Sequence, residues 1–223
     1  MTESFLLLEF ESLRELRASL NSLVAAETNI YVAIVGATFL ALAFIGQVLG
    51  NDDQADRDKL VLGLAFGALV VVLLLGSAIY SRVVSSRITV VKYARYMNRV
   101  RSYFLSRNVG LSQFISSDIY DDMPPFGAVG TSVPILGALM SNTGMIAILN
   151  SSALAALVGI SCSLIGISNT SLFEVGDLGI QWSVVLIVVA FGLAISIHHA
   201  YQVRRYRLEE RRWIAFHPML RQD

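Results

Sequence analysis

The sequence predicts an all-α fold, that of a polytopic membrane protein with four transmembrane helices and amphipathic helices on the cytoplasmic side. Of its 223 residues, 55% are hydrophobic and 15% are charged, whereas a typical soluble domain has about 25% charged residues. The mean hydropathy is +0.62. The apolar residues also form long blocks, as expected of helices that cross a bilayer.

Four blocks are long and apolar enough to be transmembrane spans, for which about 20 residues suffice. Ile30–Gly50 and Leu60–Val84 are the first two. The uncharged stretch Val133–Ser168 is too long for one simple crossing, and we place the third span at about Thr143–Ile167. Ile180–Tyr201 is the fourth.

The distribution of Lys and Arg predicts how the spans are oriented. Loop 82–131 carries seven basic and three acidic residues, and tail 204–223 carries six and three. Loop 51–58 has four acids and one Arg. Basic loops stay in the cytoplasm, so both basic segments and both termini are expected there, at a cell inner membrane. Two crossings within 133–168 would separate the basic segments, which favours four spans.

The predicted chain therefore has five parts. They are a cytoplasmic amphipathic helix at 1–27, a transmembrane hairpin at 28–84, a basic cytoplasmic helix and loop at 85–131, a second transmembrane hairpin at 132–203, and a basic cytoplasmic tail at 204–223. Pro134 and nearby glycines weaken a regular helix before the third span, which favours an interfacial or re-entrant segment at Val133–Asn142.

The N-terminal helix carries a leucine repeat. Leu6, Leu13 and Leu20 are seven residues apart, with Leu16 and Leu23 between them. This a/d pattern favours helix pairing. The helix is expected to pack on this protein's own cytoplasmic loop or, alternatively, against another subunit.

The segment 87–107 reads as an amphipathic helix with a basic side. No Pro interrupts the chain between the second span and Asn108, so one continuous helix is expected. Its apolar side, with Met97 and Val100, must face lipid or the leucines of the N-terminal helix. Nucleic-acid binding is not expected, because the net charge is zero and no recognised nucleic-acid fold extends the basic patch. Anionic lipid headgroups are the expected partners of its basic side and of the tail, through Arg87, Lys92, Arg95, Arg99, Arg204 and Arg205.

The third span is rich in uncharged polar residues. They are expected to form interhelical hydrogen bonds or, in the sharper hypothesis, to line a pore. These residues are Asn142, Thr143, Asn150, Ser161 and Ser163.

Small residues at fourfold spacing predict close helix packing within the bundle. The candidates are Gly63, Gly67, Ala155, Gly159 and Gly192.

One carboxylate cluster, Asp118, Asp121 and Asp122, has a spacing that a divalent cation could use. Membrane prenyl- and phosphotransferases use paired aspartate motifs, but these contain further acids and a second cluster, which this chain lacks. The acids are therefore expected to offset the basic helix or to cap a turn.

No catalytic, cofactor-binding or metal-ligating set is predicted. His198 and His199 are adjacent and point about 100° apart on a helix, so they are expected to be interfacial polar residues. Cys162 is the single cysteine and is expected to be buried in a helix.

These patterns predict a non-enzymatic integral membrane protein, a subunit or scaffold of an oligomeric membrane assembly with a cytoplasmic docking layer. Homo-oligomerisation or membership of a membrane complex is expected. The alternatives are an oligomeric pore or channel or a membrane-permeabilising effector lined by span three, and, more weakly, a lipid-modifying membrane enzyme that uses the aspartates.

Overall fold

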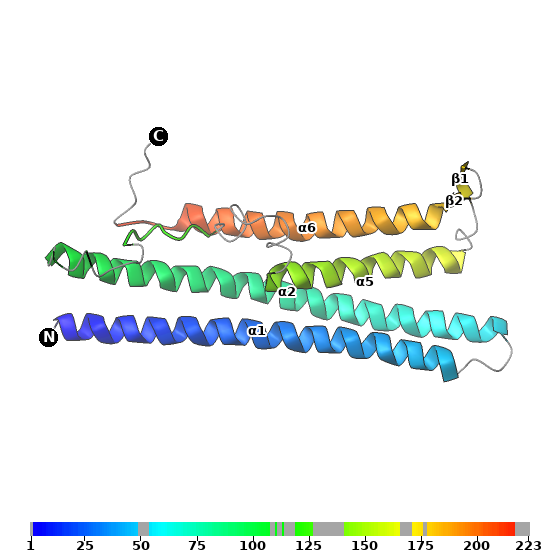
Figure 1. The fold of residues 1–223 in the computed structure, drawn as a ribbon, viewed down its shortest axis with the longest axis horizontal. Helices are drawn as coiled ribbons and strands as arrows, with labels where there is room; N and C mark the ends of the chain where they lie inside the picture. The colour runs from blue at the N-terminus through cyan, green and yellow to red at the C-terminus, as the bar shows by residue number, and fades with distance from the viewer. Residues whose placement is uncertain are drawn as a thin grey trace. The chain divides into compact units, whose positions relative to one another are not determined.

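The computed structural model describes residues 2–48, 54–107, 110, 113, 119–126, 141–165, 171–175 and 178–216. Most of them lie in the helices α1 (Thr2–Val48), α2 (Gln54–Arg107), α5 (Asn142–Ile165) and α6 (Trp182–Arg212) (Figure 1). The chain between α5 and α6 contains a small antiparallel hairpin of β1 (Ser171–Val175) and β2 (Leu178–Gln181), which the sequence did not predict.

Each of these four helices is long and apolar enough to span a membrane. Three of them exceed the length that a span needs, because α1 has 47 residues, α2 has 54 and α6 has 31. At a rise of 1.5 Å per residue, α1 alone is about 70 Å long. The expected single helix from the second span to the basic segment is confirmed, since α2 runs without interruption to Arg107.

The chain forms two compact units. We call Met1–Ala26, Arg82–Ala138 and Gln202–Asp223 the charged unit, and Glu27–Ser81 and Leu139–Tyr201 the apolar unit. α1, α2 and α6 contribute residues to both, whereas α5 belongs to the apolar unit alone. The predicted re-entrant segment lies outside the described residues, except for its last residue, Asn142, which begins α5.

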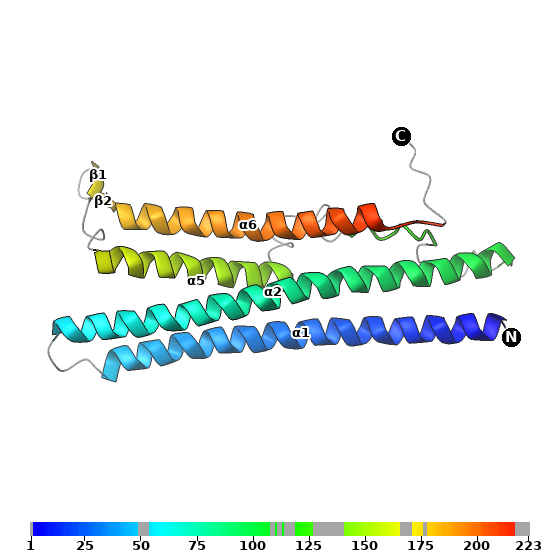
Figure 2. The ribbon, with the colours of Figure 1, turned by 180° about the vertical axis from the view of Figure 1, so that it is seen from behind.

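The apolar unit has a small buried core and an apolar outer surface. Tyr31 and Ile146 are fully buried in it. Large side chains face outward, among them Leu40 at 74% exposure and Leu74 at 66%. A surface with so many exposed large hydrophobic residues is suited to a lipid environment. Its helical segments lie alongside one another, as Figures 1 and 2 show.

In the charged unit, the N-terminal part of α1 lies beside the C-terminal part of α2 (Figure 2). The guanidinium carbon of Arg101 is 5.3 Å from the centroid of the Phe10 ring, and Arg107 pairs with Glu3 at 3.6 Å. Met97 and Val100 on α2 are buried. The apolar side of the basic helix therefore meets α1 of the same chain.

The leucine repeat is only partly used for this contact. Leu13 is buried, but Leu16 and Leu23 are exposed at 46% and 42%. Phe10, which is half-buried, and Val24, which is buried, lie on the same side of α1 as Leu13. With 3.6 residues per turn, the buried side of α1 therefore extends from Leu13 away from Leu16 and Leu23. Leu16 and Leu23 are left on an outer face.

Candidate functional site

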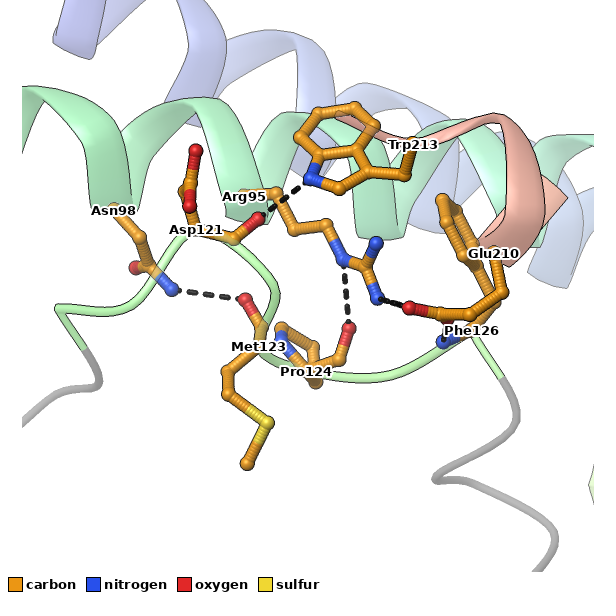
Figure 3. Close-up of polar contacts among 8 residues, drawn as sticks. All are labelled: Arg95, Asn98, Asp121, Met123, Pro124, Phe126, Glu210 and Trp213. Carbon is orange, nitrogen blue, oxygen red and sulfur yellow. Dashed lines mark hydrogen bonds and ion pairs between the residues drawn. The ribbon is translucent and has the colours of Figure 1, made fainter. Parts of the chain in front are cut away.

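Polar side chains gather in two clusters, one in each unit. We name each cluster after its most buried polar residue. The Arg95 cluster, in the charged unit, comprises Arg95, Asn98, Arg99, Asp121, Pro124, Phe126, Glu210 and Trp213, all of which except Arg99 are drawn in Figure 3. The Asn150 cluster, in the apolar unit, comprises Tyr31, Gly76, Tyr80, Asn150 and His198.

The guanidinium of Arg95 is fully buried and binds two other segments of the chain. Its Nη2 donates to both carboxylate oxygens of Glu210 on α6, at 2.8 and 2.9 Å, and its Nε donates to the carbonyl oxygen of Pro124 at 3.1 Å (Figure 3). The guanidinium carbon lies 4.2 Å from the centroid of the Phe126 ring and 5.2 Å from that of Trp213. A buried cation needs such a counter-charge and such hydrogen bonds to offset its lost hydration.

A second ion pair fixes the segment 119–126 and the chain after α6. Arg99 Nε donates to Asp121 Oδ2 at 2.7 Å, and Asp121 is fully buried. The same oxygen accepts from the backbone N–H of Phe216 at 2.8 Å. Trp213 Nε1 donates to the backbone carbonyl of Asp121 at 2.8 Å (Figure 3). Asp121 is thus held from α2 and from the C-terminal segment at once.

A third ion pair joins α2 to α6. Lys92 Nζ is 2.7 Å from Glu209 Oε2. The hydrogen bond from Lys92 is the largest cause that lowers the pKa of the Glu209 carboxyl below its usual value of 4.5. Glu209 and Glu210 together therefore neutralise two of the basic residues that the sequence assigned to lipid.

The predicted lipid-headgroup contact is wrong for Arg95, because this side chain is fully buried and paired. Lys92 and Arg99 are engaged with Glu209 and Asp121 inside the chain. Arg87 and Arg205 are half-buried, whereas Arg204 is exposed. Sequence patterns could not show that Glu209 and Glu210 of α6 pair with Lys92 and Arg95 of α2.

The structure places the predicted carboxylate cluster only in part. Asp118 lies outside the described residues. Asp121 uses its carboxylate for Arg99 and for the backbone of Phe216. Within the described ranges, no group of three or more His, Cys, Asp or Glu side chains lies close enough together to hold a metal ion.

In the apolar unit, Asn150 bridges two neighbouring helices. The Tyr31 hydroxyl of α1 donates to Asn150 Oδ1 at 2.5 Å, and both residues are fully buried. Asn150 Nδ2 is 3.3 Å from His198 Nε2, and His198 Nδ1 is 2.8 Å from the carbonyl oxygen of Ala194. This arrangement assigns the ring proton to Nδ1, so that Nε2 accepts from Asn150.

Tyr80 brings α2 into the same network. Its hydroxyl donates to the backbone carbonyl of His198 at 2.7 Å, and the two rings meet edge to face with centroids 4.7 Å apart. α1, α2, α5 and α6 each contribute one side chain to this buried network. For Asn150, the prediction of interhelical hydrogen bonding is confirmed.

Among the described residues, the remaining polar candidates of α5 make no hydrogen bond to another helix. Thr143 contacts Ser141, whose hydroxyl accepts from the N–H of Gly144 at 3.1 Å and caps the helix. Ser161 donates to its own helix at the Leu157 carbonyl, at 2.8 Å. Asn142 is half-buried and Ser163 is exposed.

The closest helix approach occurs at Gly76, which the sequence pattern missed. A Cβ at this position would lie 2.6 Å from Tyr31 Cζ and would also clash with Asn150 Oδ1. Gly76 has no small residue four positions before or after it, so a search for small-residue stripes does not find it.

Of the predicted packing residues, Gly159 and Ala155 lie at contacts. A Cβ on Gly159 would be 3.0 Å from Ile187 Cδ1 of α6, and Ala155 is buried. At Gly63, Gly67 and Gly192, a Cβ would meet no described atom within 4 Å, so the described residues give no support for packing within the bundle at these positions. Fourfold spacing places Gly63 and Gly67 on one face of α2, whereas Gly192 lies on α6.

Comparison of the chain with protein-family models, curated proteins and solved structures finds no match.

Replacing Arg95 by Met is expected to lower the free energy of unfolding by about 3 kcal/mol, because Glu210 loses its buried partner and the segment 119–126 loses its anchor. Thermal unfolding in detergent, followed by the fluorescence of Trp213 and Trp182, measures the loss. The exposed Arg204→Met is the matched control and should change stability by less than about 0.5 kcal/mol. Equal losses for the two variants would contradict the assignment.

Gly76→Ala is expected to destabilise the apolar unit by about 1–3 kcal/mol, since the new methyl group overpacks the site at Tyr31 and Asn150. Gly67→Ala is the control, because its methyl group meets no described atom and alanine favours the helix. The same thermal measurement compares the two. Equal stability of both variants would show that the close approach at Gly76 is not required.

Acid should weaken the charged unit through Glu209. The folded-state pKa lies below 4.5, so the stabilisation is complete above that pH and is lost as the pH falls through the lowered pKa. Unfolding curves from about pH 6 to about pH 3 should therefore fall less steeply for Glu209→Gln than for the unmodified chain. Glu9→Gln, at an exposed position, should keep the original slope. An unchanged slope in Glu209→Gln would refute the assignment.

Proposed function

We propose that the protein is a non-enzymatic subunit or scaffold of an oligomeric membrane assembly, in which the charged unit forms a cytoplasmic docking layer. The four helices that can span a membrane support the membrane location. The proposal places both termini in the cytoplasm, because the basic residues of α2 and of the tail belong to the same unit.

One observation carries this proposal: α1 exposes an apolar stripe within the charged unit. Large side chains on its outer face are open to solvent, in contrast to Leu13 on its inner face. The stripe consists of Phe5 at 64% exposure, Leu8 at 67%, Leu16 at 46% and Leu23 at 42%.

Lipid is a poor cover for this stripe. Glu9, Glu11 and Glu15 are exposed on the same helical segment, and carboxylates at the depth of the hydrocarbon are costly. The stripe therefore belongs outside the hydrocarbon, where a row of exposed large apolar side chains marks a protein interaction surface.

The Arg95 cluster supports the same proposal in a different way. Its ion pairs tie α2, the segment 119–126 and the end of α6 together. A surface held by such a network is pre-organised, which reduces the entropy lost on binding. The Asn150 cluster, whose donors and acceptors are paired with neighbouring helices, supports a packed bundle.

The proposal predicts that the protein in lipid nanodiscs contains more than one copy of the chain or co-purifies with a defined partner. The variant Leu8→Glu/Leu16→Glu should release that partner, because it places two charges on the stripe, and should leave thermal stability nearly unchanged. Ala18→Glu/Asn21→Glu, of equal charge but at exposed positions away from the stripe, should be milder. Native mass spectrometry reads out the composition, and bilayer currents from the same sample test for an oligomeric pore. A lone monomer with no partner, before and after the substitutions, would refute the proposal.

A further inference from the structure

We infer that the apolar stripe of α1 is covered by the outer, basic face of α6 from a second copy of this chain. This inference rests on the proposed function and names the partner and the two surfaces that meet. It makes the contact heterologous, with different patches on the two copies, and such contacts close into rings when repeated about an axis.

The α1 stripe and the outer face of α6 carry complementary charges. The flanks of the α1 stripe carry Glu9, Glu11 and Glu15, which are exposed and form no ion pair among the described residues. On α6, the acids Glu209 and Glu210 turn inward to Lys92 and Arg95. The exposed acids next to the stripe therefore lie on α1, whose exposed Arg14 and Arg17 are on other sides of the helix.

The outer face of α6 presents the basic surplus. Arg204, Arg207 and Arg211 are exposed and likewise form no ion pair within the described part of the chain. Leu208, which is 38% exposed, lies among them. An apolar residue framed by arginines thus complements an apolar stripe framed by glutamates, and such a pairing both attracts and orients the partners.

Within the charged unit, α2 separates the α1 segment from the α6 segment. α2 contacts α1 through Arg101 and Phe10, and it contacts α6 through Lys92 and Glu209. In both ribbon views, this part of α2 runs between the α1 and α6 segments of the unit (Figures 1 and 2). The outer faces of α1 and α6 therefore point away from α2 on opposite sides and do not meet within one chain.

The contacts between the helices also show which residues lie at the same level along the helix axes. Arg107 is level with Glu3 and Arg101 with Phe10, so the antiparallel register continued along α2 brings Lys92 level with Ser19. Lys92 binds Glu209, so this part of α6 is level with Ser19 as well.

Copies that cross one bilayer in the same orientation keep equal heights. Leu208 of one copy then comes level with the part of α1 between Leu16 and Leu23 of its neighbour, and Arg211 comes level with Arg17, about 3 Å along the helix axis from Glu15. The apolar partners therefore match without a shift of either helix, and the long side chain of Arg211 has to span about 3 Å along the axis to reach Glu15.

Site-directed cross-linking between differently tagged copies tests the inference in the full-length protein. In a Cys162→Ser background, which removes the single native thiol, one copy carries Leu16→Cys and the other carries Leu208→Cys. Co-expressed in membranes and treated with a short bis-maleimide, the two are expected to form a mixed-tag dimer. Ala18→Cys with Leu208→Cys is the control, since Ala18 is at a similar height but about 160° away around α1, and it should give on the order of tenfold less product.

A charge-exchange experiment tests the electrostatic part and leaves the apolar residues in place. Arg211→Glu should weaken association on the order of tenfold, and the further change Glu15→Arg should restore it. Self-association is measured in nanodiscs of neutral lipid, and binding of the same variants to vesicles with anionic lipid is measured in parallel.

Each outcome decides the inference. A Leu16→Cys copy that cross-links mainly to another Leu16→Cys copy would show a symmetric α1–α1 contact and would overturn it. Absence of the mixed dimer in an oligomeric sample would overturn it while the proposed function stands. A monomeric sample would contradict both the inference and the proposed function. If charge exchange alters only vesicle binding, the basic face of α6 is a lipid surface and the inference is wrong.

Discussion

The burial of the Arg95 guanidinium is the constraint on which the charged unit depends. A fully buried cation is tolerated only with a counter-charge and hydrogen bonds, and here these come from Glu210 and from the carbonyl of Pro124. The two partners lie on segments that are distant in the sequence. The contacts of one side chain of α2 therefore hold the end of α6 and the segment 119–126, and the rings of Phe126 and Trp213 lie against the charge.

In the apolar unit, the buried polar side chains are paired with neutral groups instead of a counter-charge. Asn150 and Tyr31 are fully buried and satisfy each other, and His198 and Tyr80 extend the network to α6 and α2. In a lipid environment little hydrophobic force separates one packing of helices from another, so buried hydrogen bonds and a close approach at Gly76 can specify which faces meet. The two clusters thus have the same role, because each selects a single arrangement of its segments.

The sequence predicted the helices well and the side-chain partners poorly. Hydropathy and length located the four long helices, because these signals are local. The assignment of Arg95 to lipid failed since its partner, Glu210, lies 115 positions away along the chain. Leu16 and Leu23 follow the heptad spacing as well as Leu13 does, and only the packing of α2 decides which of them is buried. Asn150 was found as a polar residue in a span, but Tyr31, Tyr80 and Gly76 carry no pattern that would join them to it.

Hydrogen exchange on the full-length protein in nanodiscs tests the central claim, that the charged unit is one structure closed around Arg95. The amides of Phe126 and Phe216 bond to Glu210 and Asp121, so the account predicts that both are protected in the unmodified protein. In Arg95→Met, both should lose protection together, while the amides of α5 exchange as before. Fast exchange of both amides in the unmodified protein, or a loss confined to Phe126 in the variant, would contradict the account.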